Sequence, residues 1–200
     1  MPSTLFVSFE QEIKVLKQSL IADSREDFRY TPEEHKRALG FRVLASAHLE
    51  HFLEERCLQI ASKAAADHKS GTLTRASKCL VVWYAVTADL VIPIDNGELA
   101  NRDHIDKAFE KYRKVVTKSH GINGAKLKGL LIPIGFRDAE MSAHSSLFNQ
   151  LDSVADNRNP AAHTVVKRAM SLVAPEQEWT TIDNLMRLLV PFDADVGKLI

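Results

Sequence analysis

Cysteine is nearly absent from this chain of 200 residues, which contains only Cys57 and Cys79. Both lie within apolar segments of helical spacing, and neither belongs to a Cys-x-x-Cys pair or to a Cys/His pattern typical of zinc ligands. We therefore expect neither a disulfide framework nor a zinc site. The two cysteines are predicted to be small core residues.

An excess of charge of one sign is also lacking. The 26 Lys and Arg residues balance 26 Asp and Glu residues. The chain as a whole is therefore neither a basic wrapper for nucleic acid nor an acidic tail, so any site for a polyanion has to be local.

Long hydrophobic runs are missing as well. The longest uncharged apolar run, from Cys79 to Ala88, is too short to span a bilayer. The first residues include Glu10 and Glu12 and lack the cationic stretch of a secretory signal. We therefore expect a cytoplasmic protein that does not associate with membranes.

Apolar residues recur at helical spacing through almost all of the sequence, which predicts an all-α fold. The clearest helix start is Thr31-Pro32-Glu33-Glu34, a capping box with proline at the first helical position. The helix that follows, toward Ala66, is apolar on several sides, as expected of a central helix. Other helices are expected at 5–20, 73–90, 102–119, 142–156, 160–173 and 175–189, with a loop or short hairpin over 121–135.

The helix over 102–119 belongs to the most basic stretch of the chain. Between Arg102 and Lys128 there are eight Lys and Arg residues against three acids. The pattern is compatible with a solvated helix face and with a track for a phosphate backbone. The lysines expected to face outward, and so the candidate RNA-binding residues, are Lys107, Lys111, Lys114 and Lys118.

Arg158 and His163 are the most informative pair in the chain. Because proline favours the first helical position and disfavours a helical residue before it, Asn159 is predicted to cap a new helix that begins at Pro160. Arg158 and His163 would then occupy the two positions that touch in a hydrophobic staple.

This arrangement admits a structural and a chemical interpretation. The structural one is a polar staple, or a histidine at a seam between helices. The chemical one is an anion site at a helix N-terminus, where Arg158 binds phosphate oxygens and His163 moves protons near neutral pH. These are the groups that metal-independent phosphodiester cleavage needs.

The segment Leu151-Asp-Ser-Val-Ala-Asp-Asn-Arg-Asn-Pro-Ala-Ala-His163 resembles the Arg-x4–6-His signature of HEPN domains. The segment Ala45-Ser-Ala-His-Leu-Glu-His-Phe-Leu-Glu-Glu-Arg-Cys57 is similar to the early core helix of these domains, especially of the RiboL-PSP type. The resemblance covers about residues 35–175 of a single domain over 1–200, so flanking helices at 1–30 and 175–200 are additions.

The resemblance implies a helical bundle that dimerises with two motifs facing one cleft. It also implies a metal-independent endoribonuclease without a cofactor, in toxin-antitoxin or antiviral defence systems, with RNA as substrate and an antitoxin or other regulatory protein as a further partner. Arg158 and His163 correspond to the catalytic pair and Asn159 to the accompanying polar residue, with Glu50 or Glu54 as a supporting acid. A non-catalytic HEPN scaffold that binds RNA, a nucleotide or a partner protein is the alternative.

We expect a structural role for two other polar clusters, one around His48 and His51 and one around Asp103 and His104. His48 and His51 could bind one metal, but the spacing is not His-Glu-x-x-His, and His48 lies on an apolar stripe. Asp103, beside His104, is expected to cap the helix that follows. We therefore expect no metal site.

Overall fold

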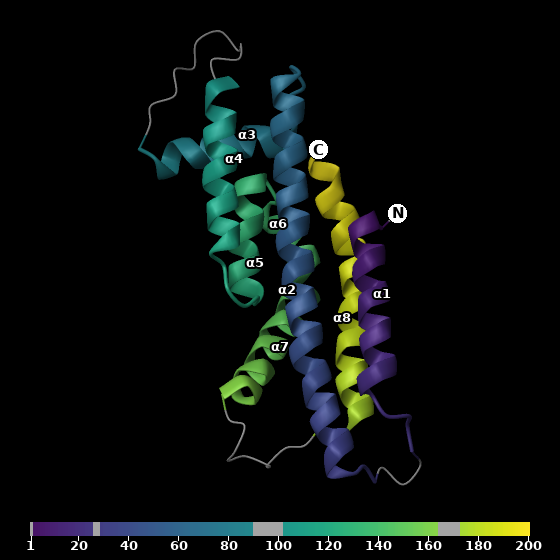
Figure 1. Cartoon of the computed structure of the whole chain (residues 1–200). Helices are drawn as coiled ribbons and strands as arrows, with labels where there is room; N and C mark the ends of the chain where they lie inside the picture. The colour runs from purple at the N-terminus through teal and green to yellow at the C-terminus, as the bar shows by residue number, and fades with distance from the viewer. Residues whose placement is uncertain (1, 26–28, 90–101, 164–172) are drawn as a thin grey trace.

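The computed structural model describes residues 2–25, 29–89, 102–163 and 173–200, and the side chains of all of these except 102, 103 and 157–163. Figure 1 shows an elongated bundle with one helix, α2, along its length. The helices are α1 (Thr4–Leu20), α2 (Pro32–Lys69), α3 (Arg75–Thr87), α4 (Arg102–Thr117), α5 (Gly124–Leu131), α6 (Asp138–Ala143), α7 (Ser145–His163) and α8 (Pro175–Val196), with 3-10 helices η1 (Ile132–Ile134) and η2 (Gly197–Leu199).

The predicted all-α fold is confirmed, since every regular element in these ranges is a helix. The predicted capping box opens α2: Thr31 Oγ1 accepts the Glu34 N–H at 3.2 Å, and Glu34 Oε2 accepts the Thr31 N–H at 2.7 Å. Together these bonds satisfy two N–H groups that have no partner inside the helix. The helix predicted at 73–90 corresponds to α3, and residue 90 lies outside the described residues.

Two groups of helices pack on α2, and they also meet each other where α7 contacts α8. The antiparallel pair α1 and α8 packs along one side of it, and α3, α4, α5 and α7 pack on the other (Figure 1). On the first side, the ring of Phe9 stacks on Phe52 with centroids 4.9 Å apart. An element that is apolar on several sides is thus placed between neighbours, as its sequence predicts.

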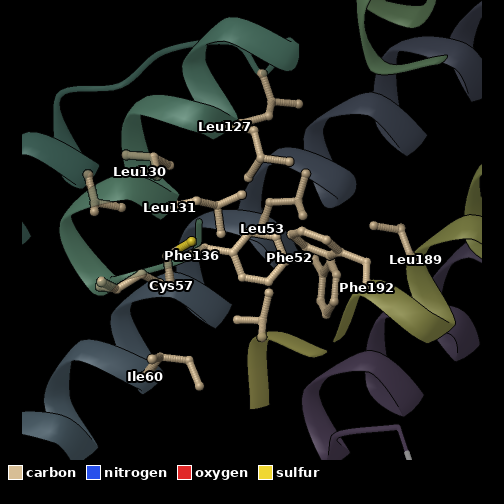
Figure 2. Close-up of a cluster of buried hydrophobic side chains, with 14 of the residues drawn as sticks. Phe52, Leu53, Cys57, Ile60, Leu127, Leu130, Leu131, Phe136, Leu189 and Phe192 are labelled. Carbon is tan, nitrogen blue, oxygen red and sulfur yellow. The ribbon is translucent and has the colours of Figure 1, made fainter. Parts of the chain in front are cut away.

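The core continues from α2 into α5, η1 and α8. Figure 2 shows Phe52 and Cys57 of α2 beside Leu131 of α5 and Phe192 of α8. Burial raises the pKa of the Cys57 thiol to about 12, so this thiol is unreactive at neutral pH. Both cysteines are free, and Cys79 is only half-buried.

The segment 121–136 differs from the sequence-based expectation of a loop or hairpin. It forms α5, capped by the Asn123 side chain, followed by the 3-10 turn η1. Leu127, Leu130 and Leu131 are buried, and the Tyr112 hydroxyl donates to the Leu130 carbonyl at 2.8 Å. Packing against the core therefore stabilises a helix that is too short and glycine-rich to form by propensity alone.

A buried polar network ties α1, α2 and α8 together. Asp193 is fully buried and pairs with Arg56 of α2, with Nε and Oδ1 2.6 Å apart. The same carboxylate accepts the Ser3 N–H at 2.6 Å and the Ser3 hydroxyl at 3.0 Å. A buried charge needs such partners, because their loss leaves it without compensation for the water it has given up.

Candidate functional site

Helix α7 contains the Arg158–His163 motif and does not break where the sequence predicts. It runs without interruption from Ser145 to His163, so Asn159 is not a helix cap and Pro160 lies inside the helix. The predicted new helix at Pro160 is therefore wrong. The rule about proline describes where a helix begins, whereas this helix arrives from Ser145, and Pro160 removes one backbone hydrogen bond from it at a cost of about 3 kcal/mol.

The continuous helix changes the relation between Arg158 and His163. Five residues along a regular α-helix correspond to a net rotation of about 140°. The two Cα positions therefore lie on different sides of the α7 axis, and the staple geometry has no helix start at which to form. The side chains of Arg158, Asn159 and His163 lie outside the described residues, so their catalytic assignment stays a prediction.

Glu50 and Glu54, the two candidate supporting acids, lie on α2 under the turn between α4 and α5. The Glu50 carboxylate accepts the N–H of Gly121, a residue within this turn that has a positive φ of 74°. One carboxylate oxygen of Glu54 is buried without a hydrogen-bond partner in the described part of the chain. Glu50 thus has a structural contact in this turn. The surroundings of Glu54 disfavour the ionised form of its carboxyl.

Burial, with a smaller contribution from neighbouring Glu50, raises the pKa of Glu54. His51, His120 and Lys126 act in the opposite direction. A raised pKa means that the folded chain binds this proton more tightly than the unfolded chain does, so ionised Glu54 lowers the stability when the pH is above its pKa.

We therefore predict that Glu54→Gln raises the melting temperature at about pH 8 and that this gain shrinks as the pH falls through about 4, because the wild-type carboxyl then becomes protonated in both states. Thermal unfolding of the wild type and the variant across this pH range measures the difference. Glu55→Gln, at the next position of α2, serves as the control and should show no such pH-dependent gain. A gain for Glu54→Gln that is independent of pH contradicts the assigned cause.

Of the four lysines predicted to face outward from α4, three are exposed. Lys107, Lys114 and Lys118 are exposed and form no ion pair with any residue in the described ranges. Lys111 is half-buried instead: its Nζ donates to the carbonyl and to the hydroxyl of Thr87, at 2.8 Å each. It also lies over the rings of Trp83 and Tyr84, so Lys111 joins α4 to the end of α3.

The histidines on α2 do not gather around a metal. His48 Nδ1 lies 2.8 Å from Glu12 Oε2, and His51 is exposed. No group of three or more His, Cys, Asp or Glu side chains among the described residues is arranged to hold a metal ion. Across the described ranges, no helix is both long and apolar enough to cross a membrane.

A polar concavity between α5, α6 and α7 was not predicted from the sequence. It has a volume of about 290 Å³, and its polar lining includes Lys128, Asp138 and Asn149. No spacing rule signals it, because its residues come from three helices whose packing alone brings them together. The resemblance to HEPN domains likewise stays a prediction from the motif, since comparison of the chain with family models, with curated proteins and with solved structures finds no match.

Proposed function

We propose that this chain is an endoribonuclease of the HEPN type that cleaves RNA without a metal ion. The observation that carries the proposal is the intact Arg-x4-His sequence from Arg158 to His163, on the last turns of α7 in an all-helical bundle. In this mechanism the RNA 2′-hydroxyl attacks the adjacent phosphorus, His163 transfers the proton, and Arg158 binds the phosphate oxygens. The products are a 2′,3′-cyclic phosphate and a free 5′-hydroxyl.

A homodimer is part of this proposal. A two-fold axis near the end of α7 brings two copies of the motif to one phosphate and supplies a second imidazole for the two proton transfers. Arg158 and His163 of one protomer lie on different sides of the α7 axis. In the proposed dimer, each catalytic pair is therefore formed by Arg158 of one protomer and His163 of its partner. A toxin or antiviral role, held in check by an antitoxin or other regulatory protein, follows from the same resemblance.

The basic face of α4 supports RNA as the ligand. Lys107 and Lys114 are two turns apart, and Lys118 extends the row past the end of the helix, so the three positive charges follow one line along the bundle. Neutralising a phosphate backbone releases counterions, which makes binding dependent on salt concentration. Such a row binds RNA without selecting its sequence.

We predict that the triple variant Lys107→Gln, Lys114→Gln, Lys118→Gln binds single-stranded RNA more weakly at low salt. The slope of log K against log salt should fall by about 2, since each lost phosphate contact contributes about 0.7. Fluorescence anisotropy at several salt concentrations measures this slope. The control replaces Lys14, Lys36 and Lys63, which pair with acids on α1 and α2, and removes the same charge. Equal slopes in the two triple variants contradict a specific role for α4.

A second candidate function is a HEPN scaffold that binds RNA, a nucleotide or a partner protein without cleaving it. The continuous α7 favours this alternative in one respect, because a single protomer then has no adjacent Arg158–His163 pair. RNA binding without any cleavage that depends on His163 supports the scaffold over the enzyme.

A further inference from the structure

The concavity between α5, α6 and α7 is lined by exposed polar side chains. Among the described residues, the side chains of Lys128, Asp138, Ser142, Ser145 and Asn149 have no hydrogen bond and no ion pair with any other residue. These five exposed polar groups surround one hollow, where they can act as donors and acceptors for a ligand.

The concavity also has an apolar part. Met141 and Phe148 line it and are buried in the core. The ammonium group of Lys128 lies 5.4 Å from the centroid of the Phe148 ring, which holds this cation at the edge of the hollow. The hollow is thus partly pre-formed, which lowers the entropic cost of binding.

Size and charge restrict the ligand. A volume of about 290 Å³ lies at the lower limit for sites of drug-sized molecules, so the ligand is smaller than these. Lys128 supplies one positive charge and Asp138 one negative charge to the same hollow. A phosphate or another pure anion would meet the Asp138 carboxylate, whereas a molecule with one charge of each sign matches both residues.

We propose that this concavity binds a small zwitterion, an α-amino acid in its free form. The carboxylate of the ligand pairs with Lys128, its ammonium group pairs with Asp138, and Ser142, Ser145 and Asn149 donate or accept further hydrogen bonds. The side chain of the ligand contacts Met141 and Phe148. This site is separate from the proposed endoribonuclease motif, because it lies on the first turns of α7, whereas Arg158 follows Asn149 by nine residues, about 14 Å of helix.

Calorimetric titration of the full chain tests the proposal with a panel of α-amino acids. For each one, the matched amine without the carboxylate and the N-acetyl derivative without the ammonium charge are titrated as well. At least one amino acid should bind saturably with a Kd below about 10 mM, and loss of either charge should weaken binding about tenfold or more.

Variants then assign each charge to its residue. Lys128→Met should weaken amino-acid binding about tenfold and leave binding of the matched amine nearly unchanged, because this amine has no carboxylate to pair with Lys128. Asp138→Asn should also weaken amino-acid binding about tenfold, and it should leave binding of the N-acetyl derivative nearly unchanged, because this derivative has no ammonium charge. Lys126→Met, two positions away on α5, is the matched control and should retain the wild-type affinity. The proposal is overturned if no amino acid binds, if inorganic phosphate or glycerol binds in place of amino acids, or if binding is insensitive to both Lys128→Met and Asp138→Asn.

Discussion

Replacing His163 by alanine is expected to lower the rate of RNA cleavage by about a hundredfold or more, because general acid-base catalysis contributes rate factors of this size. Cleavage by the wild type should persist in a chelator and leave a 2′,3′-cyclic phosphate, and DNA of the same sequence should resist, since it lacks the attacking 2′-hydroxyl. Arg158→Ala should reduce both RNA affinity and turnover, because it removes phosphate charge as well as orientation. Gel analysis of labelled RNA and DNA measures the cleavage rates and the product ends, and RNA-binding measurements give the affinity of Arg158→Ala.

Circular dichroism and RNA-binding measurements on the same samples separate lost chemistry from lost folding. His163→Ala should keep the helical spectrum and most of its affinity for RNA. If the wild type binds RNA but cleaves no faster than His163→Ala on varied substrates, the enzymatic proposal fails and the scaffold takes its place.

A mixture of the two inactive variants distinguishes a shared site from two separate ones. In a heterodimer of Arg158→Ala and His163→Ala protomers, a site built from both chains regains one intact Arg158–His163 pair, so cleavage should return in part. Sites contained within single protomers would remain inactive in such a mixture. This comparison follows from the continuous α7, which places the two positions on different sides of one helix.

Replacing Asp193 by alanine is expected to lower the free energy of unfolding by about 3–5 kcal/mol, the usual effect of removing one partner from a buried ion pair. The substitution leaves the Arg56 guanidinium without its carboxylate and the Ser3 N–H and hydroxyl without their acceptor. Much of the loss comes from those abandoned groups rather than from the attraction itself. Denaturant unfolding followed by circular dichroism measures it.

Asp183→Ala provides the matched control on the same helix. Asp183 pairs with Arg187 one turn away, with Nη2 and Oδ2 2.8 Å apart, and the Arg187 side chain is 76% exposed. Exposed pairs of this kind contribute at most a few tenths of a kcal/mol. Comparable destabilisation by the two substitutions would show that the buried network around Asp193 contributes no more to the free energy of unfolding than an exposed ion pair does.

The helices with strong local signals could be predicted from the sequence. The capping box at Thr31 and the apolar positions Ile105, Tyr112 and Val116 of α4 determine their own structure, because each signal lies within a few turns of one helix. The segment that forms α5 has only one such signal, the Asn123 cap, and no amphipathic pattern of comparable length. Its helix depends on contacts of Leu127 and Leu131 with residues far away in the chain, and a local pattern does not contain that information.

The candidate site was less predictable than the fold. Two preferences of proline placed a break at Pro160, but both are preferences of a few kcal/mol at most, and α7 continues through this position despite them. Lys111 is similar, since its spacing marks it as outward-facing while Thr87 and two aromatic rings hold it against α3. The concavity beside Lys128 depends on three helices at once, so it became visible only in the folded chain.

Helix α2 has a consequence for how the molecule unfolds. Its 38 residues extend for roughly 57 Å, and both groups of helices bury their apolar residues against it. Neither group has a complete core once α2 is lost, so a cut within this helix should leave two insoluble fragments rather than two working halves. Amide protons near Phe52 and Cys57 should then exchange with solvent only when the entire chain opens, at one common rate set by global unfolding.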